Sequence, residues 1–289
     1  VDRAMDQSRY MFVITIPPHF EADIRQGRQP KIQLNIDATA VLQAGLGAGY
    51  IQNILTSEIT RFTRRSNERT TLPVTIVTRR AFNPNGTQSW FAAIVALLDQ
   101  LSMLTIILTG AALLREREHG TIEHLLVMPL TSFQIAMAKV LANGLVILAA
   151  FTLSITFVVE GLLDVPIAGS KWLLLTGTTI YLFAAAAIGI FLGTITRTMA
   201  QFALLMLMVI IPMVMLSGGM SPIESQPEIL QPFTWLLPSR HYMSFAQAVI
   251  FRGAGLNIVW PEFLTVASLG FVFFTASLVL FRRSITVTK

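Results

Sequence analysis

Cysteine is absent from the 289-residue sequence, so disulfides, thiolate nucleophiles and cysteine-ligated metals are excluded. Charge is scarce as well: Asp, Glu, Lys and Arg make up 13% of the residues, against roughly 25% in a typical soluble domain. Hydrophobic residues make up 53% of the chain. So few charged side chains cannot cover the surface of a soluble protein of this size, and we expect much of the surface to face lipid.

Nucleotide-binding motifs are also missing. No Gly-x-x-x-x-Gly-Lys-Ser/Thr sequence occurs, so the chain has no phosphate-binding loop of the ATPase type. The glycine-rich run from Gly45 fails the dinucleotide-binding fingerprint, because Tyr50 stands where the last glycine is required. The net charge of +5 would suit nucleic acid, but the basic residues are scattered and many flank apolar segments. We therefore expect no cofactor on this chain and no nucleic-acid partner.

Residues 1–88 differ from the rest of the chain, because short strand and helix patterns alternate there. The segment 31–37 alternates apolar and polar residues with the period of a half-buried strand, and the apolar run 10–16 stops at Pro17 and Pro18. We predict a small α/β domain in the order β-α-β-α-β, with elements at residues 10–16, 18–26, 31–37, 40–65 and 72–78.

Long apolar segments replace these short patterns after residue 88. A bilayer core about 30 Å thick requires roughly 17 to 25 apolar residues per helix, and the segments fit or nearly fit this length. The shortest of them contains Pro212, which is expected to kink it. We predict an α-helical polytopic membrane domain at residues 89–289, with five spans at residues 90–114, 138–159, 173–195, 202–216 and 263–281.

The distribution of Lys and Arg predicts how this domain crosses the membrane. With the charged segment after the first span in the cytoplasm, the C-terminus is inside and residues 1–88 are outside. An outer N-terminal domain without a signal peptide needs a span before it, and the first residue is Val1, so we expect a six-span full-length protein. In agreement with the positive-inside rule, seven basic residues then lie inside (Arg115, Arg117, Lys139, Arg197, Arg282, Arg283 and Lys289) and three lie in short outer connections (Lys171, Arg240 and Arg252).

The connection between the last two spans, at residues 218–262, is rich in proline. Its apolar pieces, 229–237 and 242–251, are too short to cross a bilayer. Trp235 and Trp260 are typical of the boundary between lipid and water. We predict one or two amphipathic or re-entrant helices at the outer face.

A dense charge cluster follows the first span, at residues 115–129. Gly120 permits a sharp turn, Thr121 can cap a helix and Pro129 ends it, which predicts a short amphipathic helix on the inner surface. Such a helix serves as an anchor or as a contact for another protein, and we favour this interpretation over a solvated loop.

Two histidines in this segment raise the question of a zinc site. His119 and His124 are five residues apart, so they diverge by about 140° around a helix, and Gly120 interrupts any helix between them. Zinc ligands need a shared face, and we therefore expect no metal here.

Polar and small residues mark two of the predicted spans. Asp99 and Gln100 interrupt the first span, where a carboxylate is a candidate for a translocation path; the alternatives are a structural hydrogen bond to another helix or protonation near the outer interface. Gly189 and Gly193 form a Gly-x-x-x-Gly pattern in the third span, which predicts close packing of helices within one subunit or between two.

Several short motifs together carry a family resemblance. They lie at residues 16–20, 27–30, 82–84, 115–129, 216–219 and 252–255, and so extend over nearly the whole chain. The most specific is Arg-Glu-Arg-Glu-x-Gly-Thr-x-Glu, which begins at Arg115. With these motifs the sequence resembles the ABC type-2 permease family, the membrane subunits of ABC exporters, and is most similar to the YhhJ-like inner-membrane transport permeases of bacteria.

The resemblance implies a six-span permease in the bacterial cytoplasmic membrane, with a large periplasmic domain between the first two spans. It implies a dimer with an identical or different second permease subunit, and a cytoplasmic ABC ATPase that binds ATP and Mg²⁺. A periplasmic adaptor, or membrane-fusion protein, is a further expected partner. In such permeases the segment after the second span is a coupling helix that inserts in the ATPase, and the matching residues here are Arg115, Glu116, Glu118, Gly120, Thr121, Glu123 and Pro129.

These features predict a transport subunit that is not itself an enzyme. Such a permease couples ATP hydrolysis by its partner to substrate efflux by alternating access. One alternative is a mechanical transmitter, which uses the same coupling helix to act on a periplasmic partner without moving a solute. The other is a membrane-embedded hydrolase that uses Asp99 or the histidines, although the sequence contains no convincing nucleophile–base pair.

Overall fold

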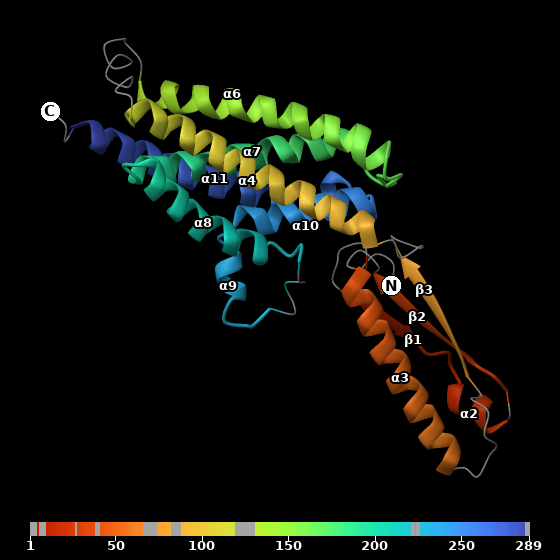
Figure 1. Cartoon of the computed structure of the whole chain (residues 1–289). Helices are drawn as coiled ribbons and strands as arrows, with labels where there is room; N and C mark the ends of the chain where they lie inside the picture. Colours follow the sequence, from red (N-terminus) through yellow and green to blue (C-terminus); the bar gives the residue numbers. More distant parts are fainter. Residues whose placement is uncertain are drawn as a thin grey trace. The chain divides into compact units, whose positions relative to one another are not determined.

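The computed structural model divides the chain into two compact units, Val1–Phe91 and Ala92–Lys289 (Figure 1). The residues that it describes are Met5 and residues 10–26, 28–37, 41–65, 74–81, 88–118, 131–220, 223 and 226–286.

The first unit contains a three-stranded mixed sheet in the order β1-β2-β3, formed by β1 (Phe12–Thr15), β2 (Lys31–Asp37) and β3 (Thr75–Ala81). β1 and β2 are antiparallel, whereas β2 and β3 are parallel, with Lys31 opposite Thr75 and Asp37 opposite Ala81. The helix α2 (Phe20–Arg25) lies between β1 and β2 in the chain, and α3 (Val41–Arg65) connects β2 to β3. The third strand begins three residues later than the pattern predicted, because its pairing with β2 decides its register.

The core of this unit lies between α3 and the sheet. Leu34, Ile36 and Ala44 are buried there, with Phe12 and Ile51 packed against them. The glycine-rich run is part of α3, and Gly47 leaves room for the Phe12 ring of β1: a Cβ at Gly47 would lie 2.3 Å from Cζ of Phe12, so the ring would have to move.

The second unit is a helical bundle. Its long helices are α4 (Gln88–Glu118), α6 (Ser132–Leu153), α7 (Lys171–Ile195), α8 (Met199–Met215) and α11 (Leu256–Thr286), and α6 continues through a π-helical segment, η1 (Ser154–Glu160). Among the described residues, four helices are long and apolar enough to cross a membrane: α4, α6 with η1, α7 and α11. The fourth predicted span corresponds to α8, whose 17 residues measure about 26 Å, less than the ~30 Å core of a bilayer.

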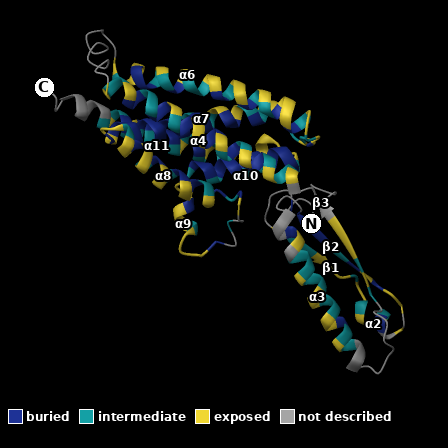
Figure 2. Cartoon of the chain, viewed as in Figure 1, coloured by how far each residue is buried: buried dark blue, intermediate teal, exposed yellow. Residues whose placement is uncertain are grey.

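Within the bundle α7 is central and α6 is peripheral (Figure 2). In the most apolar part of each helix, 67% of the α7 residues are buried, against 22% in α6 with η1. The run Ala184–Ala187 is fully buried, and its small side chains allow neighbouring helices to approach. Large apolar side chains such as Leu141 and Leu145 are exposed on α6, at 64% and 72%, as expected for a surface that faces lipid.

The connection between α8 and α11 contains the two helices α9 and α10, in the region where one or two amphipathic or re-entrant helices were predicted. The first is a single turn, α9 (Gln231–Thr234), and the second is a 15-residue helix, α10 (Pro238–Arg252). Eleven residues of α10 are buried, and the helix packs against α7, α8 and α11. Pro238 begins this helix at a position where its missing N–H costs nothing, and Gly253 ends it in the left-handed conformation, with φ of 66°.

Candidate functional site

The last turn of α4 carries the charged residues that the sequence singled out. Glu116 forms an ion pair with Lys139 of α6, whose side chain is only 12% exposed. The helix α6 begins six residues before the predicted span, at a capping box of Thr131 and Gln134, and this places Lys139 beside α4. A partly buried ion pair of this kind joins the end of α4 to the start of α6.

Arg117, the next residue, contacts the end of α7. Its Nη1 donates to the carbonyl oxygens of Gly193 at 3.3 Å, Thr194 at 2.8 Å and Thr196 at 3.3 Å. The last carbonyls of a helix have no partner within the helix and carry its negative dipole end, so a guanidinium satisfies both requirements.

Glu118, the final residue of α4, contacts the start of α8. Its Oε1 accepts a hydrogen bond of 2.8 Å from the backbone N–H of Met199. A carboxylate at the N-terminus of a helix is stabilised by the helix dipole, and here it adds to the cap that the Thr198 side chain provides. Three successive residues of α4 therefore contact α6, α7 and α8. We call the set of Glu116, Arg117, Glu118 and Lys139 the four-helix clamp.

The structure thus places only part of the predicted ATPase contact. Arg115 is an exposed residue of the last α4 turn, Glu116 pairs with Lys139, and Glu118 accepts a hydrogen bond from Met199. Gly120, Thr121, Glu123 and Pro129 lie outside the described residues, as do His119 and His124, so the docking role of the segment stays a prediction. The sequence reasoning counted Arg117 and Lys139 only as inside charges and missed their contacts.

Asp99 and Gln100 lie on α4, on the side that the rest of the bundle leaves uncovered. Gln100 is exposed, and its neighbours along the helix surface, Met103 and Leu104, are 36% and 47% exposed. Asp99 is half-buried and makes no hydrogen bond or ion pair within the described part of the chain.

The Gly-x-x-x-Gly pattern of α7 lies directly against α4. A Cβ at Gly189 would lie 2.6 Å from the carbonyl oxygen of Ile106, and one at Gly193 would lie 2.7 Å from that of Gly110. The backbones are in contact at both points, so the clamp and these glycines fix the C-terminal half of α4 on α7.

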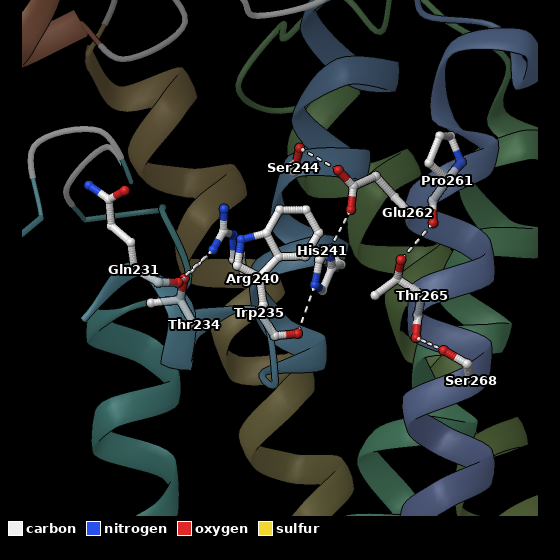
Figure 3. Close-up of polar contacts among 10 residues, drawn as sticks. All are labelled: Gln231, Thr234, Trp235, Arg240, His241, Ser244, Pro261, Glu262, Thr265 and Ser268. Atoms are coloured by element: carbon white, nitrogen blue, oxygen red, sulfur yellow. Dashed lines mark hydrogen bonds and ion pairs between the residues drawn. The ribbon is translucent and has the colours of Figure 1, made fainter. Parts of the chain in front are cut away.

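A second polar cluster lies where α10 meets α11 (Figure 3). The imidazole of His241, in the first turn of α10, is 2.6 Å from Oε2 of Glu262 through Nδ1 and 3.1 Å from the Trp235 carbonyl through Nε2. Ser244 donates to the other oxygen of Glu262 at 3.5 Å. Arg240 binds Thr234 and the Gln231 carbonyl, and its guanidinium lies 4.7 Å from the centre of the Trp235 ring.

An aromatic pair anchors α10 to α7 beneath this cluster. The rings of Tyr181 and Tyr242 stack in parallel with 4.0 Å between their centres. Tyr181 donates to Ser102 of α4 at 2.6 Å, and Tyr242 shares a hydrogen bond of 2.9 Å with Thr178. Beside this pair a small pocket lies between α7, α10 and α11, lined by Gly177, Ile180, Tyr242, Phe245, Glu262, Phe263 and Val266.

No cluster in the described residues has the donor set of a metal site, since three or more His, Asp or Glu side chains nowhere converge there. Both polar clusters join helix ends: the four-helix clamp links α4 to α6, α7 and α8, and the second cluster links α10 to α11.

Comparison with known proteins identifies the family to which the chain belongs. A family model described as ABC-2 family transporter protein matches residues 1–279. Inner membrane transport permease YhhJ of Escherichia coli (strain K12) is 49% identical over 285 residues, which are 99% of this chain and 76% of that protein. Probable multidrug ABC transporter permease YbhR of the same strain is 28% identical over 291 residues, covering 97% and 76% of the two chains. The chain therefore belongs to the ABC-2 transporter family.

A more distant relative is ABC transporter G family member 20 of Dictyostelium discoideum, 27% identical over 214 residues, 72% of this chain and 29% of that protein. Membership of the family makes the chain a membrane permease subunit of an ABC transporter and a multi-pass protein of the inner membrane. The predicted resemblance is confirmed. The family also implies, in general, an ATPase partner and dimerisation.

Proposed function

We propose that the chain is the permease subunit of an exporter, which couples ATP hydrolysis by a separate subunit to efflux of a substrate by alternating access. ATP and Mg²⁺ bind to that partner, because this chain has no phosphate-binding loop. The four-helix clamp carries the proposal. Glu116 and Glu118 belong to the predicted coupling segment 115–129, and a displacement of that segment is transmitted by the clamp to α6, α7 and α8.

The same contacts support the proposed orientation. Four helix ends meet at the clamp: the ends of α4 and α7 and the starts of α6 and α8. Arg117 and Lys139 lie at this end of the bundle, and basic residues are typical of the cytoplasmic side of a membrane protein. Trp172 and Trp260, at the opposite ends of their helices, are 81% and 56% exposed and suit the outer interface. Residues 1–88 are then periplasmic, where they are available to an adaptor, and a second permease subunit covers the uncovered face of α4 that carries Asp99 and Gln100.

The test uses the full-length permease purified with its ATPase. Binding of the ATPase and efflux are compared between the wild type and two charge-reversal variants. Glu123→Arg is expected to abolish binding of the ATPase, because it alters the docking segment itself. Glu118→Arg is expected to retain binding but to lose efflux, because the link from α4 to α8 is broken. Glu58→Arg, an exposed residue of α3 in the other unit, is the matched control and should change neither property.

Three results would speak against the proposal or refine it. If the ATPase does not bind the wild type, or if Glu123→Arg binds it equally well, the coupling segment has no docking role. If ATP turnover responds to Glu118→Arg but no solute crosses the membrane in wild type, the chain is a mechanical transmitter instead.

A further inference from the structure

Asp99 is the single acidic residue of the five predicted spans. The helix α4 rises about 13 Å from Trp90 to Asp99, which places the carboxyl group within a hydrocarbon core about 30 Å thick. A carboxylate at such a place is costly unless a cation accompanies it. The identity of that cation therefore decides what Asp99 does.

The hydroxyl groups one turn from Asp99 donate their hydrogens elsewhere. Ser102 donates to the carbonyl oxygen of Leu98 at 2.8 Å, and it accepts a hydrogen bond of 2.6 Å from Tyr181 of α7. Each of the two hydroxyls carries one hydrogen, so neither has one left for a carboxylate. Asp99 is thus not held by the polar contact between α4 and α7 that lies next to it.

A basic partner for Asp99 is also missing from the spans. Lys139 is their single basic residue, and it pairs with Glu116 at the other end of α4. If the second permease subunit is a copy of this chain, it brings another Asp99 to the interface and no further Lys or Arg from its spans. The spans of both subunits supply negative charge at this depth and leave the positive charge to a ligand.

The surface around Asp99 is apolar and adaptable. Met103, Leu104 and Leu108 are exposed on the following turns of α4, and the flexible side chain of methionine adjusts to partners of different shape. A bound metal ion would need several oxygen ligands, whereas this face offers the Asp99 carboxylate and the Gln100 amide. The surface therefore suits a large apolar body that carries a positive charge.

The helix α8 lies beside this part of α4. A Cβ at Gly110 would lie 2.5 Å from the Phe202 ring of α8, and a Cβ at Gly219, just after α8, would lie 2.7 Å from Cγ1 of Val95. Asp99 lies between these two contact points on α4. The large apolar residues that α8 exposes are Leu204, Leu207, Met208, Ile211 and Met215.

We propose that the face of α4 around Asp99, together with the adjoining apolar surface of α8, binds the exported substrate and selects organic cations with a large apolar body. The Asp99 carboxylate balances the positive charge, Gln100 contacts polar groups, and the methionine and leucine side chains contact the apolar body. The proposal rests on the proposed efflux function, since it names the class of its substrate.

Two ions of nearly equal size and shape but opposite charge isolate the contribution of charge: tetraphenylphosphonium and tetraphenylborate. Saturable binding of each radiolabelled ion is measured separately on the full-length permease with its ATPase, in nanodiscs of uncharged phosphatidylcholine, with empty nanodiscs as background. The wild type is expected to bind the cation and not the anion.

Asp99→Asn keeps the shape of the side chain and removes its charge, so it should weaken binding of tetraphenylphosphonium by about tenfold or more. Asp99→Glu should retain most of the affinity. Glu58→Gln removes an exposed carboxylate of the other unit and should change nothing. The melting temperature and ATPase binding of Asp99→Asn should match those of the wild type.

Three results would each overturn the proposal: no saturable binding of the cation to the wild type, equal affinity for the two ions, or equal affinity of the wild type and Asp99→Asn. The comparison of the two ions uses the wild type alone, so it decides the proposal even if Asp99→Asn is unstable. Failure here leaves the proposed coupling to an ATPase standing, and loss of ATPase binding with the cation still bound would leave the Asp99 site standing.

Discussion

The guanidinium of Arg117 lies 2.8 Å from the carbonyl oxygen of Thr194, so a residue of α4 completes the C-terminus of α7. The same nitrogen, Nη1, also lies 3.3 Å from the carbonyl oxygens of Gly193 and Thr196, so a single cationic group serves three carbonyls at this helix end.

We expect Arg117→Gln to lower the free energy of unfolding by about 1 kcal/mol, the lower range for hydrogen bonds to a charged group that is partly exposed. Arg117→Lys should lose about half of that, because it keeps the charge at the helix end. Thermal denaturation of the purified permease in detergent measures both. Equal stability of all three proteins would show that the contact contributes nothing to folding.

Gly189→Ala is predicted to lower the free energy of unfolding by more than Arg117→Gln does. The added methyl group would meet the backbone of Ile106 at 2.6 Å, and a backbone cannot move aside as a side chain can, so the cost is about 1–3 kcal/mol. Gly144→Ala is the matched control on another membrane helix, because a Cβ there meets nothing within 4 Å. The prediction fails if the two variants melt at the same temperature.

In the N-terminal unit, two glycines of α3 should respond in opposite directions. Gly49→Ala has open space and should stabilise the helix by about 0.5–1 kcal/mol through lower chain entropy in the unfolded state. Gly47→Ala should destabilise the unit, because the Phe12 ring has to move. Protease susceptibility of residues 1–88 in the intact permease reports both changes, and stabilisation by Gly47→Ala would contradict the packing described.

Tyr181→Phe keeps the stacked pair with Tyr242 but removes the hydrogen bond to Ser102. Loss of this buried hydrogen bond of 2.6 Å should lower the free energy of unfolding by only about 1 kcal/mol, because the Ser102 hydroxyl still has the Leu98 carbonyl as a partner. Tyr50→Phe, at a tyrosine that is 70% exposed, should be neutral. Chemical unfolding of the two variants in one detergent distinguishes them, and equal costs would mean that the buried bond is not specific.

Local features of the chain were predictable because they depend on neighbours in sequence. Apolar runs predicted all five long helices of the bundle, although α8 proved shorter than a bilayer core. Where the sequence left alternatives open, the reason was tertiary. The pattern before α11 allowed an amphipathic or a re-entrant helix, and the burial of α10 depends on partners elsewhere in the fold: Ser239, His241 and Tyr242 find polar partners on other elements.

The sequence by itself determined the properties that depend on composition and on short motifs. These are the lack of cysteine chemistry, the lack of a phosphate-binding loop in this sequence, and helices apolar enough to cross a membrane. Only the tertiary structure decided which charges meet. Arg117 lies 77 residues from Thr194 and Glu118 lies 81 residues from Met199 in the chain, and no local periodicity encodes such pairs. Close contact of α4 with α7 at their glycines brings these groups together, and the low dielectric of a partly buried site then makes each pairing specific.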